Sequence, residues 1–130
     1  MMFSFNRPLV SVAVPMYNNS RFIGDTIRSI LAQSFTDFEL LIFDDHSTDD
    51  SVEIASSFSD SRIKIFRSPV NLGPEKNWNR SISDVRGRYV KLVCGDDILF
   101  PECLEKQVAV LENPLHAGVS LVSCQRTIID

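Results

Sequence analysis

Tyr89-Val90-Lys91-Leu92-Val93-Cys94-Gly95-Asp96-Asp97 is an apolar run that ends in a glycine and two adjacent carboxylates. The apolar part is short enough for one buried strand. In an open α/β sheet, ligands bind outside the carboxyl ends of the strands, so a site is expected here. A second apolar run, Phe38-Glu39-Leu40-Leu41-Ile42-Phe43, ends in the acidic pair Asp44-Asp45. The sequence therefore predicts two strands that deliver paired carboxylates to one edge of a sheet.

Composition favours a single globular domain. Of the 130 residues, 44% are hydrophobic and 23% are charged, and no apolar run is long enough to span a bilayer. We expect an N-terminal extension over residues 1–8 and one domain over residues 9–130. The net charge of −4 offers no basic surface for phosphate contacts, which argues against a nucleic-acid partner.

The cysteines indicate a reducing compartment. Cys94, Cys103 and Cys124 are widely spaced and form no CxxC pair, which favours reduced thiols over disulfides or zinc. The first residues also lack the long apolar core of a signal peptide. We therefore expect a cytoplasmic protein. Attachment of a longer protein to the inner face of the membrane, and association as a homo-oligomer, stay open.

Strand and helix patterns alternate along the chain. Strands are expected over residues 9–14, 38–43, 62–67, 89–94 and 118–124, and helices over 21–34, from about 50, over 75–87 and over 102–112. Asn19 or Ser20 could cap the first helix, and Asp50 with Glu53 has the spacing of a capping box. The alternation predicts an α/β fold with a mostly parallel central sheet and helices on both faces. Residues 127–130 again resemble a strand, which predicts a domain truncated at its C-terminus.

Asp96 and Asp97 are the first candidates for chemistry. They could simply cap the turn after the strand, but adjacent like charges repel each other and a cap needs only one of them. Mg²⁺ or Mn²⁺ would relieve this repulsion, because such ions bind through one or two carboxylates together with substrate phosphates. Gly95 would let the backbone or a ligand approach closely. These residues predict a metal and phosphate site.

The ends of the other strands carry further candidates. Asp45 could accept hydrogen bonds from a base or ribose, or Asp44 and Asp45 could belong to a solvated loop with helix caps. Tyr17, followed by Asn18, could stack on a nucleobase or close the edge of the domain. His46 is expected to be a loop residue rather than a general base.

The start of the third helix is rich in polar residues. Its free N–H groups could meet an anion, with Asn71, Gly73, Asn77 and Asn79 around them. Trp78, between the two later asparagines, is expected in the core. The sequence contains no GxxxxGK[ST] and no GxGxxG, which disfavours a P-loop nucleotide hydrolase and a nicotinamide-dependent dehydrogenase.

Together these motifs resemble the family-2 glycosyltransferases, which have the Rossmann-like, nucleotide-sugar-binding GT-A fold. The matching stretches are Val10–Asn18, Ile30–Phe35, Asp44–Asp49, Asn71–Asn79, Gly87–Val90 and Gly95–Asp97. The resemblance spans Val10 to Val122 and corresponds to the N-terminal portion of such enzymes. It implies the donor-binding part of an inverting, metal-dependent enzyme. Such an enzyme moves a sugar from a UDP- or dTDP-type donor to a glycan or lipid-linked acceptor.

The resemblance also implies roles for individual residues. Pro15 and Tyr17 would line the base pocket, with Tyr17 stacked on the base and Asn18 in the same nucleotide-binding loop. The remaining assignments are a hydrogen bond to the base for Asp45, a place near the ribose for Asp96, coordination of Mg²⁺ or Mn²⁺ for Asp97, and a place beside the nucleotide for Asn79.

Two departures from the family pattern matter. Cys94 stands where many members have a further aspartate, which leaves the metal site mainly to Asp97. No acid between Val119 and Asp130 matches the family's catalytic base, so the base is expected beyond Asp130 and this chain alone should turn over poorly or not at all. The alternatives are a nucleotide-binding module without catalysis and a nucleotidyltransferase of similar fold, although the latter usually has a Gly-rich loop after its first strand.

Overall fold

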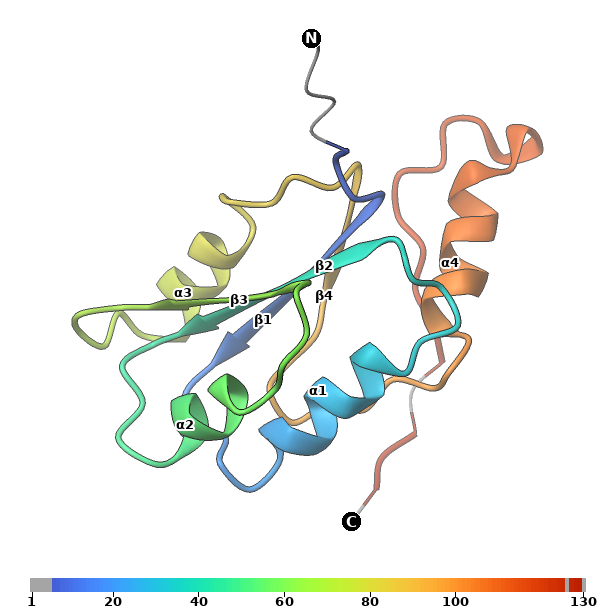
Figure 1. Cartoon of the computed structure of the whole chain (residues 1–130). Coiled ribbons are helices and arrows are strands. Elements are labelled where there is room, and N and C mark those ends of the chain that lie inside the picture. Colours follow the sequence, from blue (N-terminus) through green and yellow to red (C-terminus); the bar gives the residue numbers. More distant parts are fainter. Residues whose placement is uncertain (1–5, 126, 130) are drawn as a thin grey trace, which may run out of the picture.

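The computed structural model describes residues 6–125 and 127–129, and within them four strands form one parallel sheet in the order β3-β2-β1-β4 (Figure 1). The strands are β1 (Val10–Met16), β2 (Phe38–Asp44), β3 (Ile63–Arg67) and β4 (Tyr89–Leu92). The helices are α1 (Ile23–Leu31), α2 (Ser51–Ser56), α3 (Pro74–Ser81) and α4 (Cys103–Glu112), followed by a 3₁₀ turn, Pro114–His116. The predicted α/β fold with a parallel central sheet is confirmed.

The two central strands, β1 and β2, end at the same height in the sheet, so the loops that follow them start side by side. Every residue of β1 and β2 is buried, as expected for apolar runs covered on both faces of a parallel sheet. The two strands pair in register from Val10 with Phe38 to Met16 with Asp44. Their carboxyl ends therefore coincide, and the loops that follow them leave the sheet side by side.

Helices cover both faces of the sheet, as predicted. Val12, Val14 and Leu40 belong to a core that α1, α2 and α4 complete, whereas Ala13 and Leu41 belong to a second cluster on the other face. The second face packs against α3, and Figure 1 shows α3 behind the sheet, on the side away from α1 and α2. No helix among the described residues is both long enough and apolar enough to cross a membrane.

The strand expected over residues 118–124 is wrong. This segment is mostly exposed and belongs to no strand, and neither do residues 127–129. It approaches β4 through side chains, with the Lys91 Nζ atom 3.9 Å from the Cys124 Sγ atom, but it does not join the sheet. Residues 1–5 of the expected extension, and Asp130, lie outside the described residues.

Neither predicted side-chain helix cap forms. Asn19 uses its backbone carbonyl, which accepts hydrogen bonds from the N–H groups of Phe22 and Ile23 at 2.9 and 2.8 Å. Asp50 is the N-cap residue of α2, yet its side chain makes no capping hydrogen bond. The turn before α1 thus satisfies the first donors through its own backbone, whereas at α2 the Ser51 N–H donates to the Asp49 carboxylate at 3.0 Å, one residue earlier than the predicted cap.

A buried carboxylate fixes the start of β4. The Glu39 carboxylate accepts hydrogen bonds from the Ser11 hydroxyl at 2.6 Å and from the Arg86 guanidinium at 2.7 Å. Burial raises the pKa of Glu39, but these hydrogen bonds outweigh it, and the net pKa is lowered. The Ser11 hydroxyl oxygen also accepts from the Gly87 N–H at 2.8 Å, so β4 is held beside β1.

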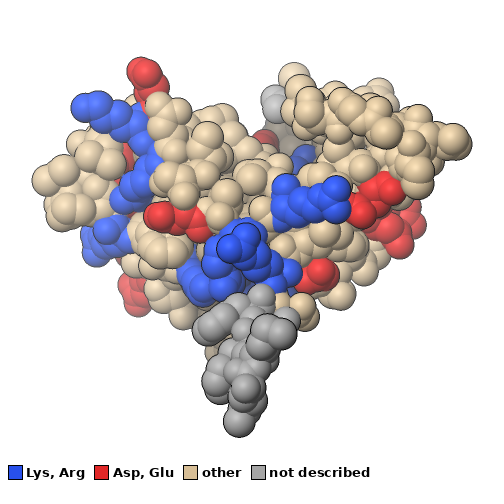
Figure 2. Space-filling model, turned by 90° about the horizontal axis from the view of Figure 1, so that it is seen from above, with Lys and Arg blue, Asp and Glu red and all other residues tan. Residues whose placement is uncertain are grey.

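Basic side chains gather at the end of the molecule where the strands begin. Figure 2 shows a group of Lys and Arg side chains on the face seen from above. Arg62, Arg86 and Arg88 each come shortly before a strand and pair with Asp60, Glu39 and Glu112, respectively. These pairs offset part of the positive charge of that end.

Candidate functional site

The carboxyl ends of β1, β2 and β4 surround an open cleft of about 290 Å³. Its lining consists of Pro15, Met16, Tyr17, Asn19, Asp45, Asn71, Pro74, Asn77, Trp78, Cys94, Gly95 and Asp96. Four predicted site residues therefore lie around one cleft, namely Pro15, Tyr17, Asp45 and Asp96. Asn18, Asn79 and Asp97 do not line it.

A close approach between two loops positions the aromatic residue of the cleft. Tyr17 is 47% exposed, and its backbone N–H donates to the Asn19 Oδ1 atom at 3.0 Å. A Cβ added to Gly95 would lie only 2.6 Å from that same Oδ1 atom. The prediction that Gly95 permits a close approach is confirmed, and its neighbour is Asn19. The glycine thus brings the loop that carries Tyr17 against the loop that carries Asp96.

The loops after β1 and β2 are tied together by Asn18. Its Oδ1 atom accepts a hydrogen bond from the Thr48 N–H at 2.8 Å, and its own N–H donates to the Ser47 hydroxyl oxygen at 3.0 Å. Asn18 and His46 both have left-handed backbone angles, with φ of 50° and 62°. Such conformations persist where surrounding contacts enforce them. Asn18 therefore orders the loop next to Tyr17, and its contact with a nucleotide stays a prediction.

The acidic pair at the end of β2 is buried, so the alternative of a solvated loop is wrong for both residues. Asp44 is 0% exposed, accepts from the Ser47 N–H at 3.1 Å, and lies 3.4 Å from the Arg67 Nε atom. Asp45 is 2% exposed, and its two carboxylate oxygens accept from the N–H groups of Leu72 and Gly73 at 2.7 and 2.9 Å. A carboxylate has about four lone-pair positions, so Asp45 keeps the capacity to accept from a ligand.

Helix α3 presents a polar side to the sheet, and the expectation that Trp78 lies in the core is wrong. Asn77 and Ser81 are its buried residues, and the Asn77 Nδ2 atom donates to the Phe43 carbonyl at 2.9 Å. This hydrogen bond satisfies a buried backbone acceptor at the end of β2. Trp78 is instead 42% exposed and lines the cleft. Asn79 is exposed on the same helix.

The two aspartates in the turn after β4 make different contacts. The Asp97 N–H donates to the Cys94 carbonyl at 3.0 Å, and an Asp97 carboxylate oxygen accepts from the Cys94 N–H at 3.2 Å. Asp97 therefore caps this turn, while Asp96 borders the cleft. From α1, the Thr26 hydroxyl donates to the Gly95 carbonyl at 3.1 Å and fixes the turn from below.

The two exposed carboxylates fit a metal that binds mainly through a ligand's phosphates. Among the described residues, no group of three His, Cys, Asp or Glu side chains gathers as a metal site. Mg²⁺ commonly uses only one or two protein carboxylates and completes its shell with phosphate oxygens and water. The Asp97 carboxylate accepts a single hydrogen bond and keeps lone pairs that could coordinate an ion, with Asp96 next to it in the sequence.

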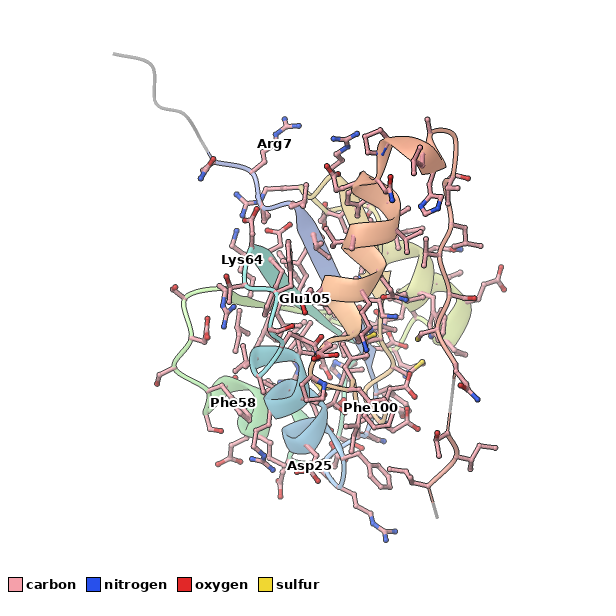
Figure 3. All side chains as sticks on the ribbon, turned by 90° about the vertical axis from the view of Figure 1, so that its right-hand side faces the viewer. Arg7, Asp25, Phe58, Lys64, Phe100 and Glu105 are labelled. Atoms are coloured by element: carbon pink, nitrogen blue, oxygen red, sulfur yellow. The ribbon has the colours of Figure 1, made fainter. Side chains whose placement is uncertain are left out.

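The sequence interpretation missed the role of Gln33. This side chain is 4% exposed, donates to the Phe100 carbonyl at 2.7 Å and accepts from the Leu104 N–H at 3.0 Å. It thereby ties α1 to the segment that follows Asp97. Phe100 itself is 71% exposed and lies toward the same end of the molecule as Asp25, away from Arg7 (Figure 3). The available signal was a polar side chain directly after the apolar end of the first helix, Ile30-Leu31.

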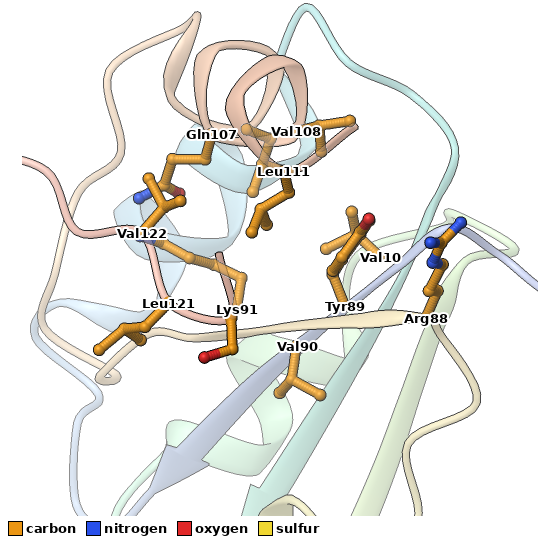
Figure 4. Close-up of a pocket in the computed structure, with 12 residues that line it drawn as sticks. Val10, Arg88, Tyr89, Val90, Lys91, Gln107, Val108, Leu111, Leu121 and Val122 are labelled. Carbon is orange, nitrogen blue, oxygen red and sulfur yellow. The ribbon is translucent and has the colours of Figure 1, made fainter. Parts of the chain in front are cut away.

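A second cleft, of about 260 Å³, lies between β4, α4 and the segment after the 3₁₀ turn. Figure 4 shows Val108 and Leu111 of α4 on one side of it, Tyr89 and Val90 of β4 on another, and Leu121 nearby. Hydrocarbon dominates this lining, and none of the predicted site residues contributes to it. The chemistry-bearing residues thus gather at the first cleft.

Comparison with known proteins identifies the family. Residues 11–127 match the model of glycosyl transferase family 2. The chain belongs to this family. EpsE of Bacillus subtilis strain 168 is 39% identical over 115 residues, which are 86% of this chain and 41% of EpsE. TuaG of the same organism, whose name refers to teichuronic acid biosynthesis, is 38% identical over 130 residues, or 95% of this chain and 52% of TuaG. The family-2 chain thus spans about half or less of these two relatives.

Solved structures agree with the fold. S. aureus TarS 1-349 in complex with UDP-GlcNAc superposes with a TM-score of 0.75 at 30% identity, over 79% of this chain and 31% of that chain. The same TarS portion has also been solved in complex with UDP. A mannosyltransferase from Pyrobaculum calidifontis, in complex with GDP-Man and Mn²⁺, has a TM-score of 0.72 at 24% identity, over 85% of this chain and 34% of that chain. The GT-A fold expected from the resemblance is confirmed.

Proposed function

We propose that this chain is the donor-binding part of an inverting, metal-dependent glycosyltransferase that uses a UDP- or dTDP-sugar. One observation carries the proposal: the exposed ring of Tyr17, the buried carboxylate of Asp45 and the exposed carboxylate of Asp96 meet around one cleft. An aromatic face, a hydrogen-bond acceptor and an acid near a possible metal are the groups that a nucleoside diphosphate requires. The similarity to TarS, which binds UDP-GlcNAc, supports this assignment.

Asp45 favours a base with an N–H on its recognition edge. Uracil and thymine have an N3–H that can donate a hydrogen bond to the carboxylate, whereas the N3 atom of cytosine is an acceptor and cytosine can donate only through its neighbouring N4 amino group. Tyr17 supplies a ring on which the base can stack, beside Pro15. Asn18 supports this loop through Thr48, and Asn79 lies on the helix that flanks the nucleotide. We therefore expect the site to prefer UDP or dTDP over CDP.

The diphosphate would lie toward β4. A bound Mg²⁺ or Mn²⁺ would neutralise charge on the departing nucleoside diphosphate. On the protein side, Asp97 would hold the ion, and Asp96, which borders the cleft, would lie near the ribose. The Thr26 hydroxyl donates to the Gly95 carbonyl in the turn that carries both acids, and the Asn19 side chain lies close to that glycine. This arrangement orients the donor but supplies no assigned catalytic base.

We propose that transfer of the sugar to an acceptor requires parts of the whole protein beyond this chain. A glycan or lipid-linked acceptor and a base beyond Asp130 would complete the transfer, so we expect this chain to bind donor with little or no turnover. We propose that the whole protein works in the cytoplasm at the inner face of a membrane, because three widely spaced cysteines favour reduced thiols.

Calorimetric titration of the chain with UDP, dTDP and CDP in the presence of Mn²⁺ tests the proposal. We expect saturable binding of UDP or dTDP and binding of CDP that is at least about 10-fold weaker, which corresponds to one lost hydrogen bond to a charged acceptor. Tyr17→Ala should weaken binding of the preferred nucleotide. A folded sample that binds none of the three nucleotides would refute the proposal. Donor binding without turnover, even in a longer chain, would instead favour a nucleotide-binding module.

A further inference from the structure

Trp78 occupies an unusual place for the only tryptophan in the chain. Tryptophan side chains are highly buried on average, yet this one is 42% exposed and borders the cleft with Tyr17, Asp45 and Asp96. A large aromatic side chain left exposed at a cleft that also contains polar groups is typical of a ligand contact.

The position of Trp78 is fixed by its neighbours on α3. Asn77 bonds the Phe43 carbonyl at 2.9 Å, and an Arg80 guanidinium nitrogen bonds both the Asp44 carbonyl at 3.0 Å and the Asn77 Oδ1 atom at 2.9 Å. Successive helix residues are about 100° apart around the axis, so fixing Asn77 against the sheet turns Trp78 toward the flank of the helix. The indole is therefore presented to the cleft by a rigid backbone.

Trp78 lies on the base side of the cleft rather than the diphosphate side. Asp45 holds the N-terminal end of α3 through the Gly73 N–H at 2.9 Å, and Trp78 follows one helical turn later. Asp96 and Asp97 follow β4, which β1 separates from β2 in the sheet. A nucleotide whose base reaches Asp45 and whose phosphates reach Asp97 would place its nucleoside next to Trp78.

We propose that Trp78 is a donor-recognition residue whose indole packs against the nucleoside of the bound nucleotide, as a second aromatic contact besides Tyr17. The inference rests on the proposed function, because it takes UDP or dTDP as the occupant of the cleft. It adds a residue that motif spacing assigned to the core. It also predicts that affinity gained through Trp78 is the same for uridine, UMP and UDP.

The single tryptophan makes a direct test available. Fluorescence of the chain is recorded during titration with UDP and Mn²⁺, and calorimetry gives an independent affinity. We expect a saturable change in tryptophan emission that yields the calorimetric Kd. Trp78→Ala should weaken uridine, UMP and UDP equally, by about 5- to 30-fold, as for the loss of one base–aromatic stack. Trp78→Phe should recover most of this loss.

Ile82→Ala provides the matched control, because Ile82 is a 50% exposed apolar residue directly after α3 that does not line the cleft. Its nucleotide affinity should be unchanged, and circular dichroism should show that both alanine variants are folded. Unchanged UDP affinity in Trp78→Ala, with flat emission in the parent chain, would overturn the inference while leaving the proposed function intact. A loss of affinity seen for UDP but not for uridine or UMP would overturn the nucleoside assignment. Absence of UDP binding by calorimetry would overturn the proposed function, and this inference with it.

Discussion

The Asp45 carboxylate accepts a hydrogen bond from the Gly73 backbone N–H at 2.9 Å, so the acid at the end of β2 holds the start of α3. Its other oxygen accepts from the Leu72 N–H at 2.7 Å. Gly73 has a φ of 88°, which a residue with a side chain rarely adopts, and this turn directs the two N–H groups toward the carboxylate. The Asp45 side chain thus lines the cleft and also fixes the loop that leads into α3.

Asp45→Ala should therefore lower both stability and nucleotide affinity. Loss of the carboxylate leaves two backbone donors without their partner, which typically costs about 1–3 kcal/mol in the free energy of unfolding for each buried group. Urea denaturation and calorimetry with UDP measure the two effects. Asp50→Ala is the control, because Asp50 is exposed and makes no side-chain cap, and it should change stability by less than about 0.5 kcal/mol. Full UDP affinity in Asp45→Ala would contradict the role of this acid.

The Glu39–Arg86 pair should contribute far more to stability than the Arg88–Glu112 pair. Glu39 is 4% exposed and depends on Arg86, so Arg86→Ala leaves a buried carboxylate poorly compensated. Because Arg86 is itself about half exposed, we expect a loss of roughly 1–3 kcal/mol rather than the larger cost of a fully buried pair. Arg88→Ala removes an exposed pair at 3.6 Å and should cost less than about 0.5 kcal/mol. Equal urea midpoints for the two variants would refute the difference.

Asp49 should make stability depend on pH in acid. Burial raises its pKa, but hydrogen bonds from Ser51 and Ser20 dominate and lower the pKa from 3.8 to about 2. A carboxyl whose folded pKa is lowered stabilises the fold above its unfolded pKa, and this contribution disappears as the pH falls through the folded pKa. The difference in urea midpoint between the parent chain and Asp49→Asn should therefore shrink between pH 3.8 and about 2. A difference that stays constant across this range would show that the charge of Asp49 is immaterial.

The sequence was enough to predict which residues meet at the carboxyl ends of the strands. Apolar runs that terminate in Asp44-Asp45 and Gly95-Asp96-Asp97 must bring these residues to one edge of a parallel sheet, and the structure confirms this meeting. Local spacing could not separate Asp44, which faces Arg67, from Asp45, which faces the α3 loop, because that division depends on contacts more than 20 residues away.

The exposure of Trp78 could not be predicted from the sequence, and the reason is the way α3 packs against the sheet. Hydrophobic periodicity assigns the apolar stripe of a helix to the core, but α3 packs with Asn77 inward because a carbonyl at the end of β2 needs a donor. The sequence of α3 alone does not show that the Phe43 carbonyl, 34 residues earlier, accepts a hydrogen bond from this helix. The strand expected over residues 118–124 is wrong for a related reason, since an apolar pattern does not show whether the edge of a neighbouring strand is available for pairing.

Gly95→Ala should disturb the cleft without unfolding the protein. The new Cβ would lie 2.6 Å from the Asn19 Oδ1 atom, which also accepts from the Tyr17 N–H, so Asn19 and Tyr17 must move. Overpacking of this kind costs about 1–3 kcal/mol, and we expect UDP affinity to fall with it. Gly24→Ala is the control: its Cβ would meet the flexible end of Arg28 at 3.3 Å, and alanine favours the helix by up to about 1 kcal/mol. Unchanged UDP affinity in Gly95→Ala would show that Tyr17 does not depend on this approach.

Asp97→Asn should keep the role of this residue as a cap of the turn and remove its proposed role as a metal ligand. In the parent chain the Cys94 N–H donates to the Asp97 carboxylate at 3.2 Å. An asparagine side-chain oxygen can accept the same hydrogen bond, so the variant should keep the stability of the parent chain. It loses the negative charge that a divalent cation requires, and UDP affinity in Mn²⁺ should fall by at least about 10-fold, to the value that EDTA produces in the parent chain. EDTA should then have no further effect on Asp97→Asn, because two changes that remove one interaction are not additive. Uridine, which has no phosphate, should bind equally to both proteins with or without Mn²⁺. A further loss on adding EDTA to Asp97→Asn would mean that Asp96 or another group holds the metal.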